Sequence, residues 1–376
     1  MSYQFEVNNP VSTPPRFRCT AIVVNFNGGL FLRECLESLA AQTAPSVELE
    51  IVVVDNGSTD GSQEIVAAEF PGMTLIRSAR NLGFGGGVNL ALANTTGDLV
   101  VLINNDAVAE PGFLEAITAP FHSGNPRLGA VTARVVLSGS FVRLDAEAPA
   151  PAESTAYVSP SGERWARLPA GTDLAVGRQL INSTGNQISA SGNGRDRSWL
   201  VPVDQDASPA SVFGFCGGGA ALAREALADV GNFDERLFMY YEDTDLSWRL
   251  RRSGWEIAYA ADAAVTHRHA ASSGIRSRFF LTHNIRNRIL VTARNGTPPM
   301  LRSAILRTLG SVFTAAVRSL TSRNSSDARV QARAGFAAII EAARLLPTYL
   351  REGRRLDKGS VLERRFINEW LVTDGV

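Results

Sequence analysis

The fold can be argued outward from residues 50–62, Glu50-Ile51-Val52-Val53-Val54-Asp55-Asn56-Gly57-Ser58-Thr59-Asp60-Gly61-Ser62. After Glu50, residues 51–54 are an apolar run of β-branched side chains, which predicts a buried strand over 50–54 that ends at Asp55. The polar turn that follows leads into a predicted helix at 62–70, with Ser58 or Asp60 as its N-cap. A continuous apolar strand followed by a turn and a helix is typical of a parallel sheet covered on both faces.

The same alternation of strands and helices continues through most of the chain, which predicts an α/β fold with a mostly parallel sheet. The other predicted elements are helices at 30–41, 87–94, 220–230 and 245–253 and strands at 20–25, 73–76, 98–103, 257–259 and 264–266. From 138 to 180 the periodicity is lost, and we expect an insertion or a long loop there. Residues 1–17 are expected to form a flexible tail.

The C-terminal region, residues 276–376, differs from the α/β domain at 18–275. It carries 18 Lys and Arg against 7 Asp and Glu, although the whole chain has a net charge of zero. Its predicted helices are amphipathic, with Ile305, Leu309, Phe313 and Leu320 on one face. Such a face can pack on the α/β domain or bind an anionic membrane surface. Nucleic acid is not an expected partner, because no aromatic side chains interleave with the arginines.

Cysteine content and hydropathy predict a cytoplasmic protein. The three cysteines form no CxxC pair, which is typical of a reducing compartment. No signal peptide is evident, and no uncharged apolar stretch reaches the length of a spanning helix. We therefore expect a cytoplasmic protein, peripheral on the inner face of the plasma membrane.

Polar side chains follow three of the predicted strands. They are Asn25 and Asn27 after the first, Asp55 after the second, and Asn104, Asn105 and Asp106 after the fourth. Open parallel sheets bind ligands at the carboxyl ends of their strands. A carboxylate such as Asp106 among amides suits Mg²⁺ or Mn²⁺, which prefer oxygen ligands and bridge to substrate phosphates.

Two further segments are candidates for ligand binding. Residues 80–89 are glycine-rich, and their glycines could let the backbone approach a diphosphate, but they do not match the dinucleotide fingerprint GxGxxG. His267 and His269, two of the four histidines in the chain, follow the last predicted strand. A histidine pair at a strand end, in a chain that also carries Asp106, favours metal ligation.

The segment Tyr240–Arg249 contains three carboxylates within four positions, Glu242, Asp243 and Asp245. Clustered carboxylates cost free energy unless a cation, a helix N-terminus or a proton-transfer task uses them. Capping the helix needs only one of them, which we assign to Asp245. The remaining pair is a candidate acid–base site.

Taken in order, these motifs resemble the family 2 glycosyltransferases of the GT-A fold, in particular their rhamnosyltransferase-like branch. The matching segments are VVNFNG, VVDNGSTDGS, RNLGFGGGVN, LINNDAV, FGFCGGGAAL, VGNFDERLFMYYEDTDLSWRLRRSGW and VTHRHAASSG, with a weaker continuation at His283–Arg288. The resemblance implies a metal-dependent, inverting transfer of a sugar from a nucleotide-sugar to a lipid-linked or oligosaccharide acceptor of the cell envelope. The first candidate donor is dTDP-rhamnose.

The resemblance also implies a role for each candidate residue. Asp243 would be the catalytic base with Glu242 in support, and Asp106 and His267 would bind Mg²⁺ or Mn²⁺, with Asn104 in place of the first aspartate of the DxD motif. Asp55 would bind the nucleotide base. The other expected donor-binding residues are Asn25, Asn27, Asn81, Gly83, Asn89, Asn104 and Asn105, and the expected acceptor-binding residues are Tyr241, Trp248, Gly217 and Gly218, for whose aromatic members core packing is the alternative.

Three alternatives remain open at this point. Within the class, the donor could be UDP-galactofuranose or another UDP-sugar. Outside it, an NAD-dependent oxidoreductase is disfavoured by the failed glycine fingerprint, and a non-catalytic nucleotide-sugar-binding protein is disfavoured by Asp106, Asp243 and His267. The chain is also a candidate homo-oligomer.

Overall fold

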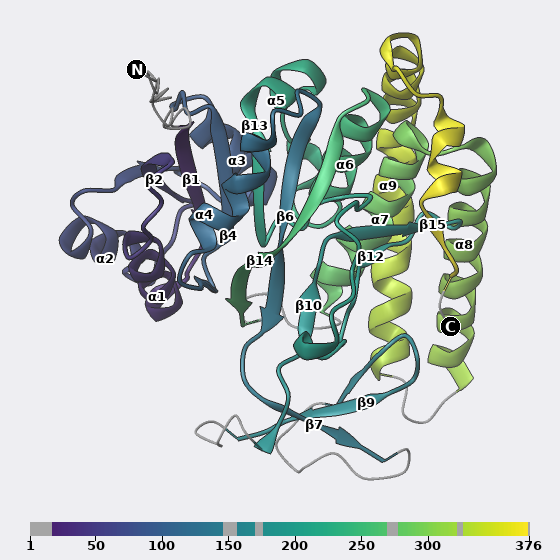
Figure 1. The fold of residues 1–376 in the computed structure, drawn as a ribbon. Coiled ribbons are helices and arrows are strands. Elements are labelled where there is room, and N and C mark those ends of the chain that lie inside the picture. Colours follow the sequence, from purple (N-terminus) through teal and green to yellow (C-terminus); the bar gives the residue numbers. More distant parts are fainter. Residues whose placement is uncertain (1–16, 146–155, 170–175, 269–276, 322–325, 375–376) are drawn as a thin grey trace, which may run out of the picture.

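A nine-stranded mixed sheet forms the centre of the protein. We describe a computed structural model at residues 17–145, 156–169, 176–268, 277–321 and 326–374 (Figure 1). The path through the sheet is β3-β2-β1-β4-β13-β6-β14-β5, with β10 paired to β6. These strands are β1 (Phe17–Asn25), β2 (Val47–Asp55), β3 (Thr74–Arg77), β4 (Leu99–Asn104), β5 (Ala107–Ala109), β6 (Leu128–Leu137), β10 (Ile181–Ser183), β13 (Gly219–Ala223) and β14 (Glu256–His267).

Helices cover both faces of the sheet, as the continuous apolar strands predict. One core cluster joins the sheet to α1 (Gly29–Ala40) and α4 (Phe113–Thr118), with α2 (Ser62–Glu69) at its margin. The other cluster joins the opposite face to α3 (Gly83–Leu92), α5 (Arg224–Val230) and α6 (Glu242–Arg252). Strand β1 serves both, since Ala21 and Val23 lie in the first cluster and Ile22 in the second. The predicted α/β fold class is confirmed.

Several predicted elements differ from those observed. The sheet is mixed rather than mostly parallel, because β13 and β5 run antiparallel to their neighbours. Residues 219–223 form strand β13 rather than the start of a helix, and a buried apolar run of this length does not distinguish the two. The two short strands predicted near 257–266 are one strand, β14, with a register shift between Ala260 and Ala264. Helix α2 has Gly61 at its N-cap, not Ser58 or Asp60.

The predicted insertion contains ordered strands in its described part. Strands β7 (Phe141–Leu144), β9 (Arg164–Arg167) and β8 (Ala156–Val158) form a three-stranded antiparallel sheet at the bottom of Figure 1. A second small sheet contains β12 (Gly194–Asp196), β11 (Asn186–Ser189) and β15 (Leu371–Val372). Strand β15 therefore ties the C-terminal end of the chain to the segment before β13.

The C-terminal helices pack against the sheet domain. Helices α7 (Arg278–Asn295), α8 (Pro298–Thr321) and α9 (Ser326–Gly359) stand side by side next to α6 in Figure 1. One apolar cluster contains Trp248 of α6, Leu290 of α7, Met300 of α8 and Tyr349 of α9. Packing is thus the outcome for α7 and the inner faces of α8 and α9. The proposed division at residue 276 stays a prediction. Of the predicted tail at 1–17, residues 1–16 lie outside the described residues, and Phe17 is the first residue of β1.

A buried ion-pair network joins α6 to α7. Asp245 is fully buried, and its carboxylate lies 2.9 Å from Arg249 Nε and 2.5 Å from an Arg294 Nη nitrogen, with Asn295 Nδ2 at 2.8 Å. Burial opposes ionisation of Asp245, but Arg294 and Arg249 hold its pKa below the usual range. The expectation that Asp245 caps the helix is therefore wrong: the N-cap is Tyr241, without a side-chain cap bond.

The network predicts a large effect on stability. Arg294 also lies 2.9 Å from Asp234, so Arg294→Met leaves two carboxylates without a shared cation. Breaking a buried pair from one side costs roughly 3–5 kcal/mol, which we expect as a lower urea midpoint. The matched control is Arg18→Met, which removes the exposed pair with Asp98 and should leave the midpoint unchanged. Equal midpoints for the two variants would contradict this account.

Candidate functional site

The ends of β4 and β14 bring Asp106 and His267 together. His267 Nε2 lies 3.1 Å from Asp106 Oδ1 and 3.3 Å from Asn104 Nδ2. The other ring nitrogen, Nδ1, lies 2.9 Å from Asn182 Oδ1, at the end of β10. Residues 163 positions apart in the chain thus meet at one edge of the sheet, as the strand-end argument predicts. His269 lies outside the described residues.

The Asp106–His267 pair fits a divalent cation. If Nδ1–H donates to Asn182 Oδ1, the Nε2 lone pair and the Asp106 carboxylate oxygen lie next to each other, and two such acceptors can share a cation. Mg²⁺ and Mn²⁺ commonly take one or two protein ligands and complete their shell with water and substrate phosphates. Among the described residues no third His, Cys, Asp or Glu is near enough to complete an all-protein site.

Asp243 occupies the first turn of α6, close to this pair. Its Oδ2 accepts from Gly217 N at 3.2 Å, and its Oδ1 accepts from Thr244 N at 2.6 Å. Asn186 also forms a hydrogen bond to this carboxylate. The neighbouring Gly218 lies against Asn104, since a Cβ atom there would be 3.4 Å from Asn104 Nδ2. The turn at 216–219 therefore connects the Asp243 carboxylate to the edge of the sheet that carries Asn104.

Glu242 and Asp243 have different environments. Burial raises the pKa of both carboxyls. The donors around Asp243 oppose this rise, whereas Glu242 is only 8% exposed and its Oε2 has no hydrogen-bond partner. Burial, together with the charge of Asp243, raises the pKa of Glu242 to about 8. At neutral pH Glu242 is therefore mostly protonated, and Asp243 is the better candidate for an ionised base.

The residues proposed to bind the nucleotide base organise their own loop. Asp55 accepts hydrogen bonds from Gly57 N, Ser58 N, Gln63 Nε2 and Asn25 Nδ2, at 2.8–3.2 Å. Three of these donors bond to Oδ2 and one to Oδ1, so Oδ1 can accept one more hydrogen bond, although Asp55 is buried. Asn105 Nδ2 in turn donates to Asn25 Oδ1, and Asn27 Oδ1 accepts from Thr59 N. Recognition of a base by this loop stays a prediction.

The glycine-rich segment packs on the loop before α6. Asn89 donates to Phe233 O and accepts from Phe233 N. Gly83 has a φ of +75°, and a Cβ there would lie 2.1 Å from Phe238 O, so only glycine fits. Asn81 Oδ1 accepts from Gly83 N. These contacts give Asn81, Gly83 and Asn89 a structural task, and no diphosphate is needed to explain the glycines.

The proposed acceptor residues separate into two groups. Trp248 is 0% exposed and packs edge-on against Phe213 with ring centroids 5.7 Å apart. It is a core residue, so its assignment to an acceptor pocket is wrong, and the alternative of core packing holds. Tyr241 is also buried, and its hydroxyl accepts from Gly194 N at 3.0 Å. Gly217 and Gly218 remain candidates through the contacts described above.

Sequence reasoning missed the clamp that holds the loop before α6. Phe238, Tyr240 and Tyr241 all have positive φ, between 64° and 70°, which is strained for non-glycine residues. Asn287 of α7 donates to three carbonyl oxygens of this loop, Leu237 O, Met239 O and Tyr240 O, at 2.7–2.9 Å. Arg286 adds two hydrogen bonds to the carbonyls of 236 and 237. The only signal in the sequence was the weak match at 283–288.

A third carboxylate, Asp196 of β12, was also missed. It is partly exposed and interacts electrostatically with both Asp243 and His267. Burial among these groups raises the pKa of Asp196 to about 6. Asp196 lies in a segment with turn residues on both sides, and its local sequence did not predict that it lies near Asp243 and His267.

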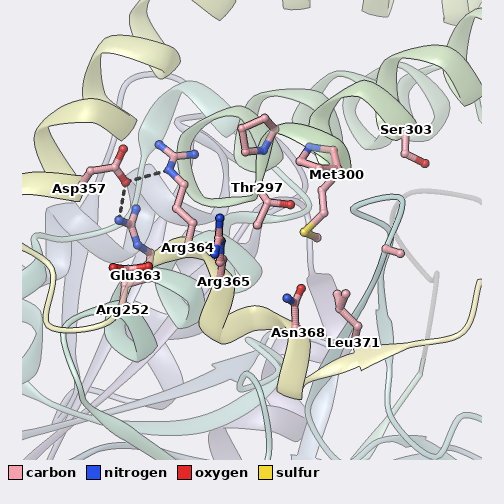
Figure 2. Close-up of a pocket in the computed structure, with 13 residues that line it drawn as sticks. Arg252, Thr297, Met300, Ser303, Asp357, Glu363, Arg364, Arg365, Asn368 and Leu371 are labelled. Atoms are coloured by element: carbon pink, nitrogen blue, oxygen red, sulfur yellow. Dashed lines mark hydrogen bonds and ion pairs between the residues drawn. The ribbon is translucent and has the colours of Figure 1, made fainter.

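A cavity of about 820 Å³ lies elsewhere, between the ends of α6 and α9 and the start of α8. Figure 2 shows Arg252 and Arg364 both directed at Asp357, with Met300 and Asn368 across the space. Arg252 follows Asp243 by nine residues in the same helix, about 14 Å along its axis. None of the candidate site residues lines this cavity, which places it apart from the proposed chemistry.

Comparison with known proteins settles the class. Residues 20–156 match the model of glycosyl transferase family 2. The chain carries a family 2 glycosyltransferase domain. It is 29% identical over 269 residues, 67% of this chain and 76% of the other, to the N-acetylglucosaminyl-diphospho-decaprenol L-rhamnosyltransferase of Mycobacterium tuberculosis. It is 25% identical to the O-antigen biosynthesis protein RfbC of Myxococcus xanthus, over 72% of this chain and 18% of that protein. The predicted family and its enzymatic class are confirmed.

One solved structure supports the predicted GT-A fold. GalNAc-T7 with UDP, GalNAc and Mn²⁺ superposes with a TM-score of 0.53 at 12% identity, over 92% of this chain and 58% of that one. The mannosyltransferase PcManGT of Pyrobaculum calidifontis, with GDP-Man and Mn²⁺, has a TM-score of 0.47 at 18% identity, over 89% of both chains. The first of these likenesses shows the fold alone.

The raised pKa of Glu242 predicts a pH-dependent stability difference. The pKa of Glu242 in the folded state is above its ordinary value of 4.5, so the folded state binds this proton more tightly than the unfolded state does. The contribution of Glu242 to the free energy of unfolding is therefore full below pH 4.5 and is lost as the pH rises to about 8. Glu242→Gln mimics the protonated form. It should therefore raise the free energy of unfolding increasingly over that window, by about 1–3 kcal/mol at pH 7, which appears as a higher melting temperature.

The comparison is a series of thermal melts of the two proteins from pH 4.5 to 8.5. The exposed Glu64 supplies the control, since Glu64→Gln should follow the wild type at every pH. A melting temperature for Glu242→Gln below that of the wild type throughout would contradict the assignment.

Proposed function

We propose that the chain transfers a sugar, with inversion, from a nucleotide-sugar to a hydroxyl group of a glycan or lipid-linked acceptor. The observation that carries the proposal is the meeting of three chain segments at one edge of the sheet. Asp106 and His267 form a cation-binding pair, and Asp243 lies on the other side of the turn at 216–219. This is the arrangement that a single displacement between a diphosphate leaving group and a hydroxyl nucleophile requires.

Asp243 is the proposed catalytic base. It takes the proton of the acceptor hydroxyl as that oxygen bonds to the anomeric carbon, while the bond from this carbon to the diphosphate breaks and the nucleoside diphosphate leaves. Gly217 N and Thr244 N orient the carboxylate and oppose the rise in its pKa that burial causes. When bound, Mg²⁺ or Mn²⁺ supplies positive charge to the departing diphosphate. Because Glu242 is mostly protonated at neutral pH, Asp243 is the negatively charged member of this pair of carboxyl groups.

The donor and acceptor are proposed from the relatives. Similarity to the mycobacterial L-rhamnosyltransferase supports dTDP-rhamnose as the donor and a diphospho-lipid-linked sugar as the acceptor. A UDP-sugar such as UDP-galactofuranose is the alternative donor. A screen of nucleotide-sugars by thermal shift with Mn²⁺ or Mg²⁺ separates them, because a bound donor raises the melting temperature.

The C-terminal helices are proposed to hold the enzyme at the inner face of the plasma membrane. The outer face of α8 exposes Leu306, Leu309, Phe313, Val317 and Leu320, the last at 87%. Helix α8 contains three arginines and no acidic residue, which complements an anionic lipid surface. It is also long and apolar enough to be a candidate spanning helix, with 28% of its most apolar window buried, whereas the sequence analysis expected none. We propose interfacial binding, because the inner face of α8 packs on the protein.

Replacement of the base should abolish transfer and preserve donor binding. Asp243→Asn is expected to lower kcat by a factor of about 10²–10⁴. The thermal shift that the donor and Mn²⁺ cause should be the same as in the wild type, and EDTA should abolish this shift in both proteins. Release of nucleoside diphosphate in the presence of acceptor measures the rate. The control, Asp262→Asn, alters an exposed carboxylate on β14 and should match the wild type. Wild-type turnover by Asp243→Asn would remove the assignment of the base.

Vesicle flotation tests the membrane surface with the full chain. The wild type should float with vesicles that contain phosphatidylglycerol and not with pure phosphatidylcholine, and added salt should weaken the binding. Phe313→Glu with Leu320→Glu should prevent flotation. Val158→Glu, at an exposed apolar residue of β8, is the matched control. Flotation of the double variant, or dimerisation of the wild type through this face in sedimentation, would contradict the proposal.

A further inference from the structure

Strand β12 carries the carboxylate of Asp196 near the start of α6. Asp196 pairs with Asn186 across the antiparallel ladder between β12 and β11, so their side chains lie next to each other. Gly194, two residues earlier on the same strand face, packs on Thr244 and Tyr241, where an added Cβ would lie 3.3 Å from each. Asp196 therefore shares its strand face with a residue in contact with the first turn of α6.

Asp196 is near both the proposed base and one member of the proposed metal pair. Asn186, its cross-strand neighbour, forms hydrogen bonds with both Asp243 and Thr244 Oγ1. Asp196 itself interacts electrostatically with Asp243 on one side and with His267 on the other, and its carboxylate has a hydrogen bond with Ser183. Unlike Glu242, it keeps part of its surface exposed. A ligand that reaches Asp243 therefore passes close to an accessible second carboxylate.

The chemistry of this position narrows the ligand that it can take. Asp196 does not complete the cation site, because no cluster of three His, Cys, Asp or Glu able to hold a metal exists among the described residues. A carboxylate repels the phosphates of a donor. It is, however, a strong acceptor for hydroxyl groups, and an acceptor sugar presents several of them beside the one that reacts.

We propose that Asp196 forms a subsite for the acceptor sugar and accepts a hydrogen bond from a hydroxyl next to the one that Asp243 deprotonates. This inference rests on the proposed function and adds to it a residue that binds the acceptor. Asn186 is the cross-strand neighbour of Asp196 and forms a hydrogen bond with Asp243. It therefore fixes the separation of the two carboxylates, and with it the separation of the two acceptor hydroxyls that they bind. Asp196 thereby selects acceptors that carry a free hydroxyl at the adjacent position.

Steady-state kinetics of Asp196→Asn test the subsite. The donor is the nucleotide-sugar that gives wild-type turnover, and the acceptor probe is a synthetic N-acetylglucosaminyl diphospho-lipid. The acceptor KM should rise roughly tenfold or more, with a smaller change in kcat and an unchanged donor KM. Release of nucleoside diphosphate to water, without acceptor, should continue at the wild-type rate. Asp262→Asn is the control, and thermal melts establish that each variant is folded.

The outcomes separate this inference from the proposed function. If the wild type itself releases no nucleoside diphosphate with any donor, the proposed function fails. If the wild type turns over the probe and Asp196→Asn leaves the acceptor KM unchanged, the subsite is wrong. A weaker thermal shift by the donor or a lower Mn²⁺ affinity in Asp196→Asn would also overturn it, because either places Asp196 on the donor side. A second probe that lacks the hydroxyl adjacent to the reacting one should be used equally by both proteins.

Discussion

The buried ion pair between Asp245 and Arg294 is the interaction on which the candidate site depends. It joins the first turn of α6 to the last turn of α7 in a fully buried setting, where an unpaired charge would be very unfavourable. The same turn of α6 carries Glu242 and Asp243, so the ion pair fixes the direction in which the proposed base points. Asn287, two turns earlier in α7, holds the strained loop that leads into this turn. Helix α7 is therefore a structural part of the candidate site.

The three carboxylates of the acidic segment differ because their surroundings differ. Asp245 has two arginines and stays ionised as a structural group. Asp243 has backbone donors and partial exposure, which suits a base that must meet a substrate. Glu242 has neither a cation nor a donor for its Oε2 atom, and it is held mostly as the neutral acid. Three similar side chains in four positions thus acquire three tasks from burial and neighbours alone.

The sequence was sufficient for features that follow from the sheet itself. Apolar runs ending in polar residues located β2 and β4, and the rule that ligands bind at strand ends correctly grouped Asp106 with His267. It was insufficient where tertiary contacts decide. The apolar pattern of residues 219–223 fits a helix or a strand. Trp248 is a residue type that often lines sugar-binding pockets, but it is buried in the cluster shared with α7. Asp196 and Asn287 interact with residues that are far from them in the chain, and their local sequence does not predict these contacts.

The stereochemistry of the product tests the central claim most directly. With Asp243 as the base and the diphosphate leaving from the opposite side, transfer is one displacement at the anomeric carbon. The account predicts that NMR of the purified product shows the anomeric configuration opposite to that of the donor sugar. A product with the configuration of the donor would contradict it, because retention through two displacements would require an enzyme carboxylate to act as a nucleophile instead of Asp243 acting as a base.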